Sequence, residues 1–204
     1  MRRTKADAEE TRASILRAAE QVFFDKGVSN ATLEDVAKSA GVTRGAIYWH
    51  FANKSDLFLA LHNSVPMPQE DMILQDAADP GADTLALIQK AAADWLAVME
   101  NDPQRQRILT ILLRCNYDSE LLPVLARQQE IDDFHTSLLE QAFQAAAEKG
   151  RLSTEWTPQS AARALRWMMK GLCSEWLLFG HRFGLAAQGG EGLEQLFSCF
   201  RTRP

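Results

Sequence analysis

One face of the short helix expected over residues 44–51 carries four side chains that could contact another molecule: Arg44, Gly45, Tyr48 and Trp49. Ile47 and Phe51 lie four residues apart and can face inward, away from this group. A short helix that exposes tyrosine and tryptophan beside a cation and a glycine is typical of a binding surface. DNA accounts for all four residues at once, because the second helix of a helix-turn-helix enters the major groove.

The preceding residues supply the first helix of such a pair and the turn. Thr32 can cap a helix together with Asp35, in the manner of a capping box. An apolar stripe at helical spacing follows: Leu33, Val36, Ala37 and Ala40. Gly41 then stands where a left-handed residue ends a helix, and Thr43 can cap the next one. We therefore favour a helix-turn-helix over an ordinary helical hairpin with an irregular surface.

A lysine stands at the start of the next expected helix. Asn53 can cap a helix that begins at Lys54, with Asp56 at its third position. A lysine in the first turn is unfavourable by itself, because that end of the helix dipole is positive. It becomes favourable if an anion docks at the free N–H groups, and a DNA phosphate is the expected anion. The sequence thus predicts that Lys54 anchors a phosphate.

Three motifs in this part of the chain resemble the DNA-binding domain of TetR-family transcriptional repressors: Thr-Leu-Glu-Asp-Val-Ala from Thr32, Ala-Gly-Val-Thr-Arg-Gly-Ala-Ile-Tyr-Trp-His-Phe from Ala40, and Asn-Lys-Ser-Asp-Leu-Phe from Asn53. Residues 1–60 look closest to the local repressors of multidrug efflux pumps. Shorter patches at 107–115 and 171–178 are also similar to efflux-repressor sequences.

The resemblance implies a set of DNA-contacting residues: Thr32, Thr43, Arg44, Gly45, Tyr48, Trp49, His50 and Lys54. Within this set, Arg44 and Gly45 are expected to read bases, and Trp49 is open between base and phosphate contact. The phosphate anchors are expected to be Thr43, Tyr48, His50 and Lys54.

The charge distribution limits how the chain could hold DNA. The net charge is −5, with nine lysines and arginines against eight acidic residues over 1–58 and thirteen against nineteen over 59–204. An acidic protein does not bind DNA through bulk charge, so a local basic surface is needed. Its candidate members are Arg2, Arg3, Lys5, Arg12, Lys38, Arg44 and Lys54.

Other features indicate a reduced, cytoplasmic protein. No apolar run approaches the roughly 18 residues that cross a bilayer, and no signal-peptide core follows Met1. The three cysteines (Cys115, Cys173 and Cys199) are widely spaced and lack a C-x-x-C pair, so each is expected to be a small apolar residue. Redox sensing by one of them stays open.

The expected fold is all-α: an N-terminal three-helix DNA-binding domain over 1–54 and a helical effector-binding and dimerisation bundle over 55–204. Helices are expected near 8–26, 83–99, 104–115, 121–149 and 158–179, with a last helix over 193–200 after a glycine-rich separator at 184–192. Pro66 and Pro68 predict a break in the helix that begins at Lys54. This break is either a hinge or simply the end of a shorter helix.

The C-terminal bundle is rich in bulky apolar residues, which more often form a core than a pocket. The family resemblance, however, implies a cavity for an apolar or amphipathic effector. By that analogy the wall candidates are Leu109, Leu113, Phe134, Met169 and Lys170. Lys170 would need a partner among apolar neighbours, or would extend to the surface.

The last two helices carry more apolar residues than one thin bundle edge can hide, which predicts a homodimer interface. Its expected members are Leu172, Trp176, Leu177, Phe179, Leu193, Leu196, Phe197 and Phe200. A symmetric dimer would place two recognition helices about one DNA turn apart on a palindromic site.

Signals for other functions are poor. The sequence contains no G-x-G-x-x-G, P-loop, H-E-x-x-H or G-x-S-x-G motif, and its four histidines are scattered. No cofactor, metal or catalytic residue is expected, although Asp132-Asp133-Phe134-His135 resembles a weak metal motif. We therefore expect a repressor of a multidrug efflux operon that an apolar drug-like effector releases from DNA. The alternatives are an effector-independent architectural protein of the same fold and an unrelated helical enzyme.

Overall fold

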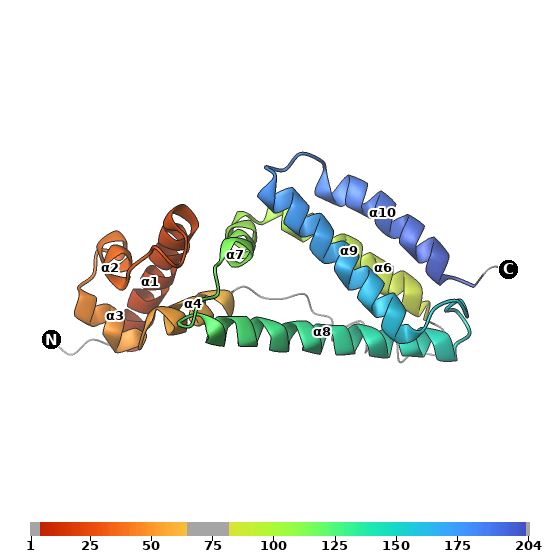
Figure 1. The fold of residues 1–204 in the computed structure, drawn as a ribbon, viewed down its shortest axis with the longest axis horizontal. Helices are drawn as coiled ribbons and strands as arrows, with labels where there is room; N and C mark the ends of the chain where they lie inside the picture. The colour runs from red at the N-terminus through yellow and green to blue at the C-terminus, as the bar shows by residue number, and fades with distance from the viewer. Residues whose placement is uncertain (1–4, 65–81, 203–204) are drawn as a thin grey trace. The chain divides into compact units, whose positions relative to one another are not determined.

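The computed structural model describes residues 5–64 and 82–202, and these ranges fold into helices, as predicted (Figure 1). The helices are α1 (Lys5–Lys26), α2 (Leu33–Ala40), α3 (Arg44–His50), α4 (Lys54–His62), α6 (Thr84–Asn101), α7 (Pro103–Arg114), α8 (Leu122–Glu148), α9 (Pro158–Leu178) and α10 (Leu185–Phe200). Leu152 and Arg201 form an isolated β-bridge. The predicted break at Pro66 and Pro68 lies outside the described residues.

The contacts divide the chain into two compact units. The N-terminal unit comprises Met1–Pro66 and Arg107–Gln128, and the C-terminal unit comprises Met67–Gln106 and Gln129–Pro204. Helices α7 and α8 therefore contribute residues to each unit. The domain boundary predicted after residue 54 stays a prediction.

The N-terminal unit is built on α1, which packs against α2 and α4. The rings of Phe23 and Phe58 meet edge to face, with their centroids 5.6 Å apart. Residues from α7, from the turn before α8 and from the start of α8 extend the same core: Ile108, Ile111, Leu112, Leu121 and Val124. The buried carboxylate of Glu20 on α1 accepts a hydrogen bond from Arg107 Nε on α7, so that an ion pair also joins these two helices.

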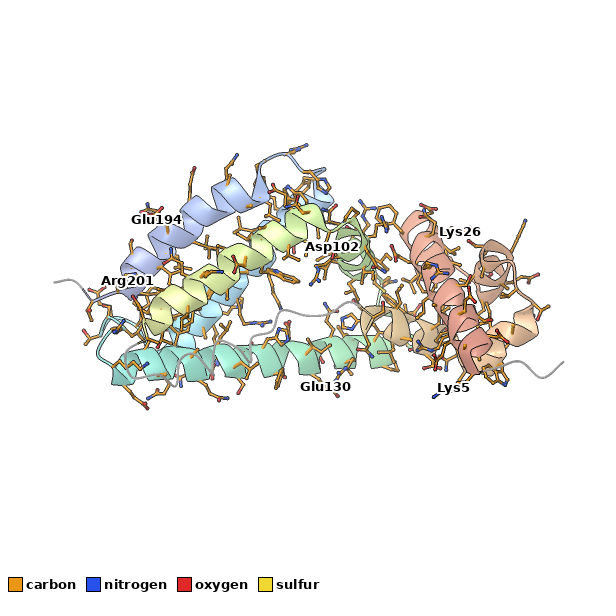
Figure 2. All side chains as sticks on the ribbon, turned by 180° about the vertical axis from the view of Figure 1, so that it is seen from behind. Lys5, Lys26, Asp102, Glu130, Glu194 and Arg201 are labelled. Carbon is orange, nitrogen blue, oxygen red and sulfur yellow. The ribbon has the colours of Figure 1, made fainter. Side chains whose placement is uncertain are left out.

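The C-terminal unit is a bundle in which α6, α9 and α10 pack together. Phe143, Phe197 and Phe200 are 0 % exposed and contact one another, and Trp156 packs on the Phe200 ring. At the end of α10, Arg201 donates to Asp83 and Gln89, which ties that end to the start of α6 (Figure 2).

The prediction of a separate glycine-rich segment before the last helix is wrong. Helix α10 begins at Leu185 and includes the glycines. A Cβ atom on Gly189 would lie 2.7 Å from Leu96 Cδ1, and one on Gly192 would lie 2.6 Å from Met168 Cε. Close packing against α6 and α9 therefore stabilises α10 and compensates for the low helix propensity of glycine. Glu100 of α6 completes the helix start, because its carboxylate accepts from the Leu185 N–H at 2.7 Å.

The glycines of α10 should differ in their tolerance of alanine. A Cβ atom on Gly190 meets no atom within 4 Å, so Gly190→Ala should stabilise the helix by up to about 1 kcal/mol. Gly189→Ala presses on Leu96, which is 0 % exposed, and should be about 1–3 kcal/mol less stable than Gly190→Ala. Urea unfolding at one protein concentration measures the difference, and equal stability of the two variants would contradict the packing explanation.

Candidate DNA-binding interface

The turn between α2 and α3 has the geometry that the sequence predicts. Thr32 Oγ1 accepts from the Asp35 N–H at 3.1 Å, and Asp35 Oδ2 accepts from the Thr32 N–H at 3.0 Å, which completes the capping box. Gly41 is left-handed, with φ +66°, and its N–H reaches the carbonyls of Ala37 and Lys38. The chain can therefore turn sharply into α3.

Helix α3 is divided into an inward and an outward face. Thr43 Oγ1 caps it by accepting from the Ala46 N–H at 3.2 Å, while Ile47 and Phe51 are buried. The four residues expected on the outer face are all exposed: Arg44, Gly45, Tyr48 and Trp49. Trp49 is 73 % exposed, a large apolar surface to leave in water without a partner.

Arg44 and Tyr48 form a pair on this outer face. Arg44 Nη2 donates to Tyr48 Oη at 3.2 Å, and the Arg44 guanidinium lies 5.4 Å from the Tyr48 ring centroid. The hydrogen bond to Tyr48 raises the pKa of Arg44 above its ordinary value, so the guanidinium stays charged. One turn of helix separates the two side chains, so Tyr48 holds the cation along the outer face of α3.

Three further residues of α3 complete this surface. The Trp49 and His50 rings meet edge to face, with centroids 4.5 Å apart, and His50 is partly buried. A Cβ atom on Gly45 would meet only Thr43 Oγ1, at 3.9 Å. The packing of the described residues therefore does not require glycine at position 45.

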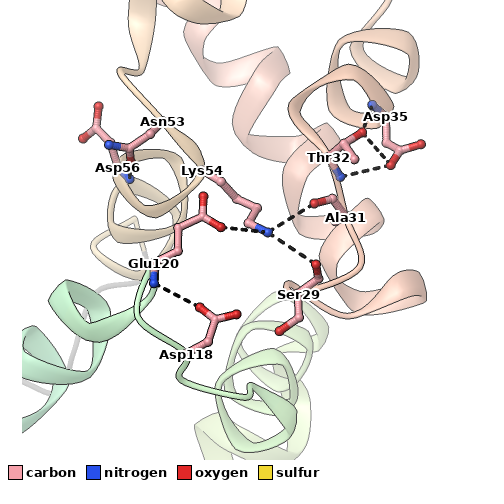
Figure 3. A network of polar contacts seen from close by, with 9 residues as sticks. All are labelled: Ser29, Ala31, Thr32, Asp35, Asn53, Lys54, Asp56, Asp118 and Glu120. Carbon is pink, nitrogen blue, oxygen red and sulfur yellow. Dashed lines mark hydrogen bonds and ion pairs between the residues drawn. The ribbon is translucent and has the colours of Figure 1, made fainter.

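Lys54, which the sequence predicts to anchor a phosphate, has three acceptors within the protein. Its side chain is only 13 % exposed, and Nζ contacts Glu120 Oε2 at 3.2 Å and the carbonyls of Ser29 and Ala31 at 3.4 Å each (Figure 3). Helix α4 does begin here, capped by Asn53 Oδ1, which accepts from the Asp56 N–H at 2.8 Å. Sequence reasoning missed Glu120, because no local pattern relates two residues so far apart in the chain.

Asp35 is the most strongly perturbed carboxylate of this region. Its hydrogen bond from Lys26 at 2.6 Å, together with those from Thr32, lowers the Asp35 pKa from 3.8 to about 2. Lys26 lies in the last turn of α1 and Asp35 in the first turn of α2. The pair therefore fixes the entry of the helix-turn-helix against α1.

The folded-state pKa of Asp35 is depressed, so its stabilising effect is complete above pH about 4 and is lost as pH falls toward about 2. Asp35→Asn should lower the Tm near neutral pH, and this loss should shrink across that window. Lys26→Met removes the largest cause of the shift, so the Asp35 pKa in the folded protein should rise. The loss of stability that Asp35 causes should then end at a higher pH than in wild type. Thermal unfolding from about pH 7 to about pH 2.5 measures each effect, and a pH-independent Asn penalty would refute the assignment.

The predicted effector contacts divide between the units. Leu109 and Leu113 belong to the N-terminal unit, whereas Phe134, Met169 and Lys170 belong to the C-terminal unit. Leu113 and Phe134 are exposed, at 41 % and 55 %. A joint pocket for the five residues stays a prediction.

Lys170 is half-exposed, and its ammonium pairs with Asp132. Arg166 Nη2 donates to the other oxygen of the same carboxylate at 2.6 Å. Asp132 on α8 is thus held by two cations from α9, a partner that sequence reasoning did not identify.

The premise of the predicted dimer interface is wrong for most of its members. Trp176, Leu177, Leu193, Phe197 and Phe200 are 0–6 % exposed within the single chain, because the C-terminal bundle covers them. Phe179 remains 57 % exposed, and Leu172 and Leu196 are partly exposed. The interface itself stays a prediction, and among its eight expected members these three keep exposed surface.

The cysteines differ in exposure. Burial raises the pKa of the Cys115 and Cys173 thiols to about 11 each, and Asp118 adds to the effect at Cys115. Cys199 is exposed on α10. A protonated thiol is a poor nucleophile, so the partly buried Cys115 and the buried Cys173 suit the apolar role expected of them.

Residues 5–64 and 82–202 are the part of the chain that the structure describes. In these ranges, His, Cys, Asp and Glu form no group of three or more that could hold a metal ion. None of the helices described there combines the length and apolar character needed to cross a membrane.

Comparison with known proteins relates both parts of the chain to bacterial regulators. Residues 15–61 match the family model for bacterial regulatory proteins of the tetR family, and residues 83–201 match the C-terminal region of MAATS-type transcriptional repressors. The transcriptional repressor BepR of Brucella suis biovar 1 (strain 1330) is 37 % identical over 203 residues, which is 99 % of this chain and 97 % of BepR.

Solved structures show the same likeness. NalD, described as the secondary repressor of the MexAB-OprM multidrug efflux pump in Pseudomonas aeruginosa, is 34 % identical, with a TM-score of 0.88 over 98 % of this chain and all of NalD. SmeT of Stenotrophomonas maltophilia, in complex with triclosan, is 25 % identical, with a TM-score of 0.78 over 95 % of this chain and 92 % of SmeT.

Proposed function

The chain belongs to the TetR family of bacterial transcriptional regulators, and from this membership we propose that it represses a multidrug efflux operon. It binds a palindromic operator as a homodimer and leaves the operator when an apolar or amphipathic effector binds. The observation that carries the DNA-binding role is the outer face of α3, where a cation, a glycine and two aromatic residues are exposed together. The efflux assignment is supported by what NalD is described as repressing.

The side chains of α3 suggest how the operator is read. Arg44 is long, charged and directed by Tyr48, so it suits a guanine edge in the major groove. Gly45 lets the helix backbone approach the bases. Thr43 and His50 flank this face and anchor phosphates, and Trp49 contacts either bases or the sugar-phosphate backbone. Thr32, at the exposed start of α2, lies at a helix end that favours a phosphate.

The effector role rests on α7, α8 and α9. Leu113 and Phe134 expose apolar surface, while Arg166, Lys170 and Asp132 form a charged cluster between α8 and α9. Within the C-terminal unit, the exposed Phe134 follows Asp132 by two residues on α8, and apolar surface together with such charges suits amphipathic molecules. The effector binds better to a conformation of the dimer in which the two α3 helices are wrongly spaced, and so lowers the population that can hold DNA. Phe179, Leu172 and Leu196 are the proposed contacts between protomers.

A DNA titration tests the proposal. A duplex is first selected by the full-length protein from a random pool, and its affinity is then measured by fluorescence anisotropy with and without triclosan, the ligand seen with SmeT. We expect triclosan to weaken binding by about 5- to 150-fold, the usual range of allosteric coupling. Unchanged DNA affinity at triclosan concentrations that calorimetry shows to saturate the protein would refute release by this effector.

Arg44→Ala should relax operator preference. Loss of one bidentate base contact should reduce discrimination at a single base position by about 1–3 kcal/mol. Lys38→Ala, at an exposed position in the last turn of α2, is the matched loss of one positive charge. It should weaken all sequences about equally and should leave the preferred sequence unchanged. Repeated selection from the random pool with each variant provides the measurement, and an unchanged preferred sequence with Arg44→Ala, as with Lys38→Ala, would show that Arg44 contacts only phosphate.

A further inference from the structure

We propose that Glu120 competes with DNA for Lys54, so that the connection between α7 and α8 restrains DNA binding. The carboxylate occupies the ammonium that a backbone phosphate would otherwise bind. The inference rests on the DNA-binding function proposed above and adds a regulatory contact to it.

The donors of Lys54 are fully used within the protein. An ammonium group donates three hydrogen bonds, and Lys54 Nζ has three acceptors: Glu120 Oε2 at 3.2 Å, Ser29 O at 3.4 Å and Ala31 O at 3.4 Å. The Lys54 side chain is 13 % exposed. A phosphate can therefore bind this group only by replacing one of the three acceptors.

Glu120 is the acceptor that a phosphate would replace. The Ser29 and Ala31 carbonyls are neutral and belong to the connection between α1 and α2, whereas the Glu120 side chain is charged and 48 % exposed. Exchange of a carboxylate for a phosphate keeps an anion next to the ammonium. A Glu120 that stayed in place would put two anions side by side, which is unfavourable. Glu120 thus lowers the affinity for DNA whether its carboxylate leaves Lys54 or stays next to it.

Lys54 lies where DNA contact is expected. It follows the Asn53 cap of α4, and Ala31, whose carbonyl it contacts, directly precedes the Thr32 cap of α2 (Figure 3). The ammonium is therefore held near two helix starts whose N–H groups favour anions.

The segment that carries Glu120 is itself held in place. Leu121 is 0 % exposed in the N-terminal core, and Asp118 Oδ1 accepts from the Glu120 N–H at 3.1 Å. Tyr117 Oη lies 2.8 Å from Gln128 Oε1 and 3.1 Å from Leu112 O, so the segment is tied to α7 and α8. A rearrangement of either helix would consequently move Glu120 relative to Lys54. These are the helices that carry the effector candidates Leu109, Leu113 and Phe134.

Glu120→Gln tests the competition, because it removes the charge and keeps the shape. With the selected duplex, the variant should bind about two- to tenfold more tightly than wild type. The slope of log K against log salt should become steeper by up to about one unit, since one more ammonium releases a counterion. Glu155→Gln, at an exposed site in the C-terminal unit, changes net charge equally and should not alter the slope.

A double-mutant cycle separates competition from a structural role. Lys54→Gln should cost about twofold or less in wild type, where Glu120 masks the ammonium, and should abolish the whole gain in the Glu120→Gln background. Weaker or unchanged DNA binding by Glu120→Gln overturns the inference, as does an equal gain from Glu155→Gln. Urea unfolding of each variant confirms that folded protein is compared. If wild type enriches no duplex from the pool, the proposed function fails instead.

Discussion

The burial of Ile47 and Phe51 is the constraint on which the proposed DNA-binding surface depends. Helix α3 has seven residues, whereas an isolated helix shorter than about 12 residues is marginal in water. It persists because Ile47 is 0 % exposed and Phe51 2 % exposed in the core that α1 and α4 build. This packing fixes the orientation of the helix, and with it the positions of the side chains on the opposite face. The DNA-binding surface is thus a property of the whole N-terminal unit rather than of its own helix.

Features that depend on neighbouring residues could be predicted from the sequence. The caps at Thr32, Thr43 and Asn53 and the left-handed Gly41 were all predictable, because a cap is a contact over three or four residues. The inward and outward faces of α3 followed from helical spacing in the same way. Most helix boundaries were therefore expected to within a few residues.

Features that depend on contacts between distant segments could not be predicted. Gly189 suggested a break because glycine is a poor helix former, but its missing side chain is what lets Leu96 approach. Phe197 and Phe200 suggested an interface because their partner Phe143 is far away in sequence. Lys54 suggested a free phosphate anchor because nothing near it indicated Glu120. In each case the local pattern contained no sign of the contact between distant residues that determines the structure.

On α3, the residues that pack against the core or cap the helix differ from the residues that face outward. This separation bears on how the regulator could change its operator sequence. Gly45 and Trp49 contribute little to the core, and a Cβ atom at position 45 would meet nothing closer than 3.9 Å. Thr43, Ile47 and Phe51 meanwhile secure the helix without projecting from its outer face. If this face reads the operator as proposed, substitutions on it alter operator preference at little cost in folding free energy. Such a helix is a favourable starting point for engineering repressors with new operators.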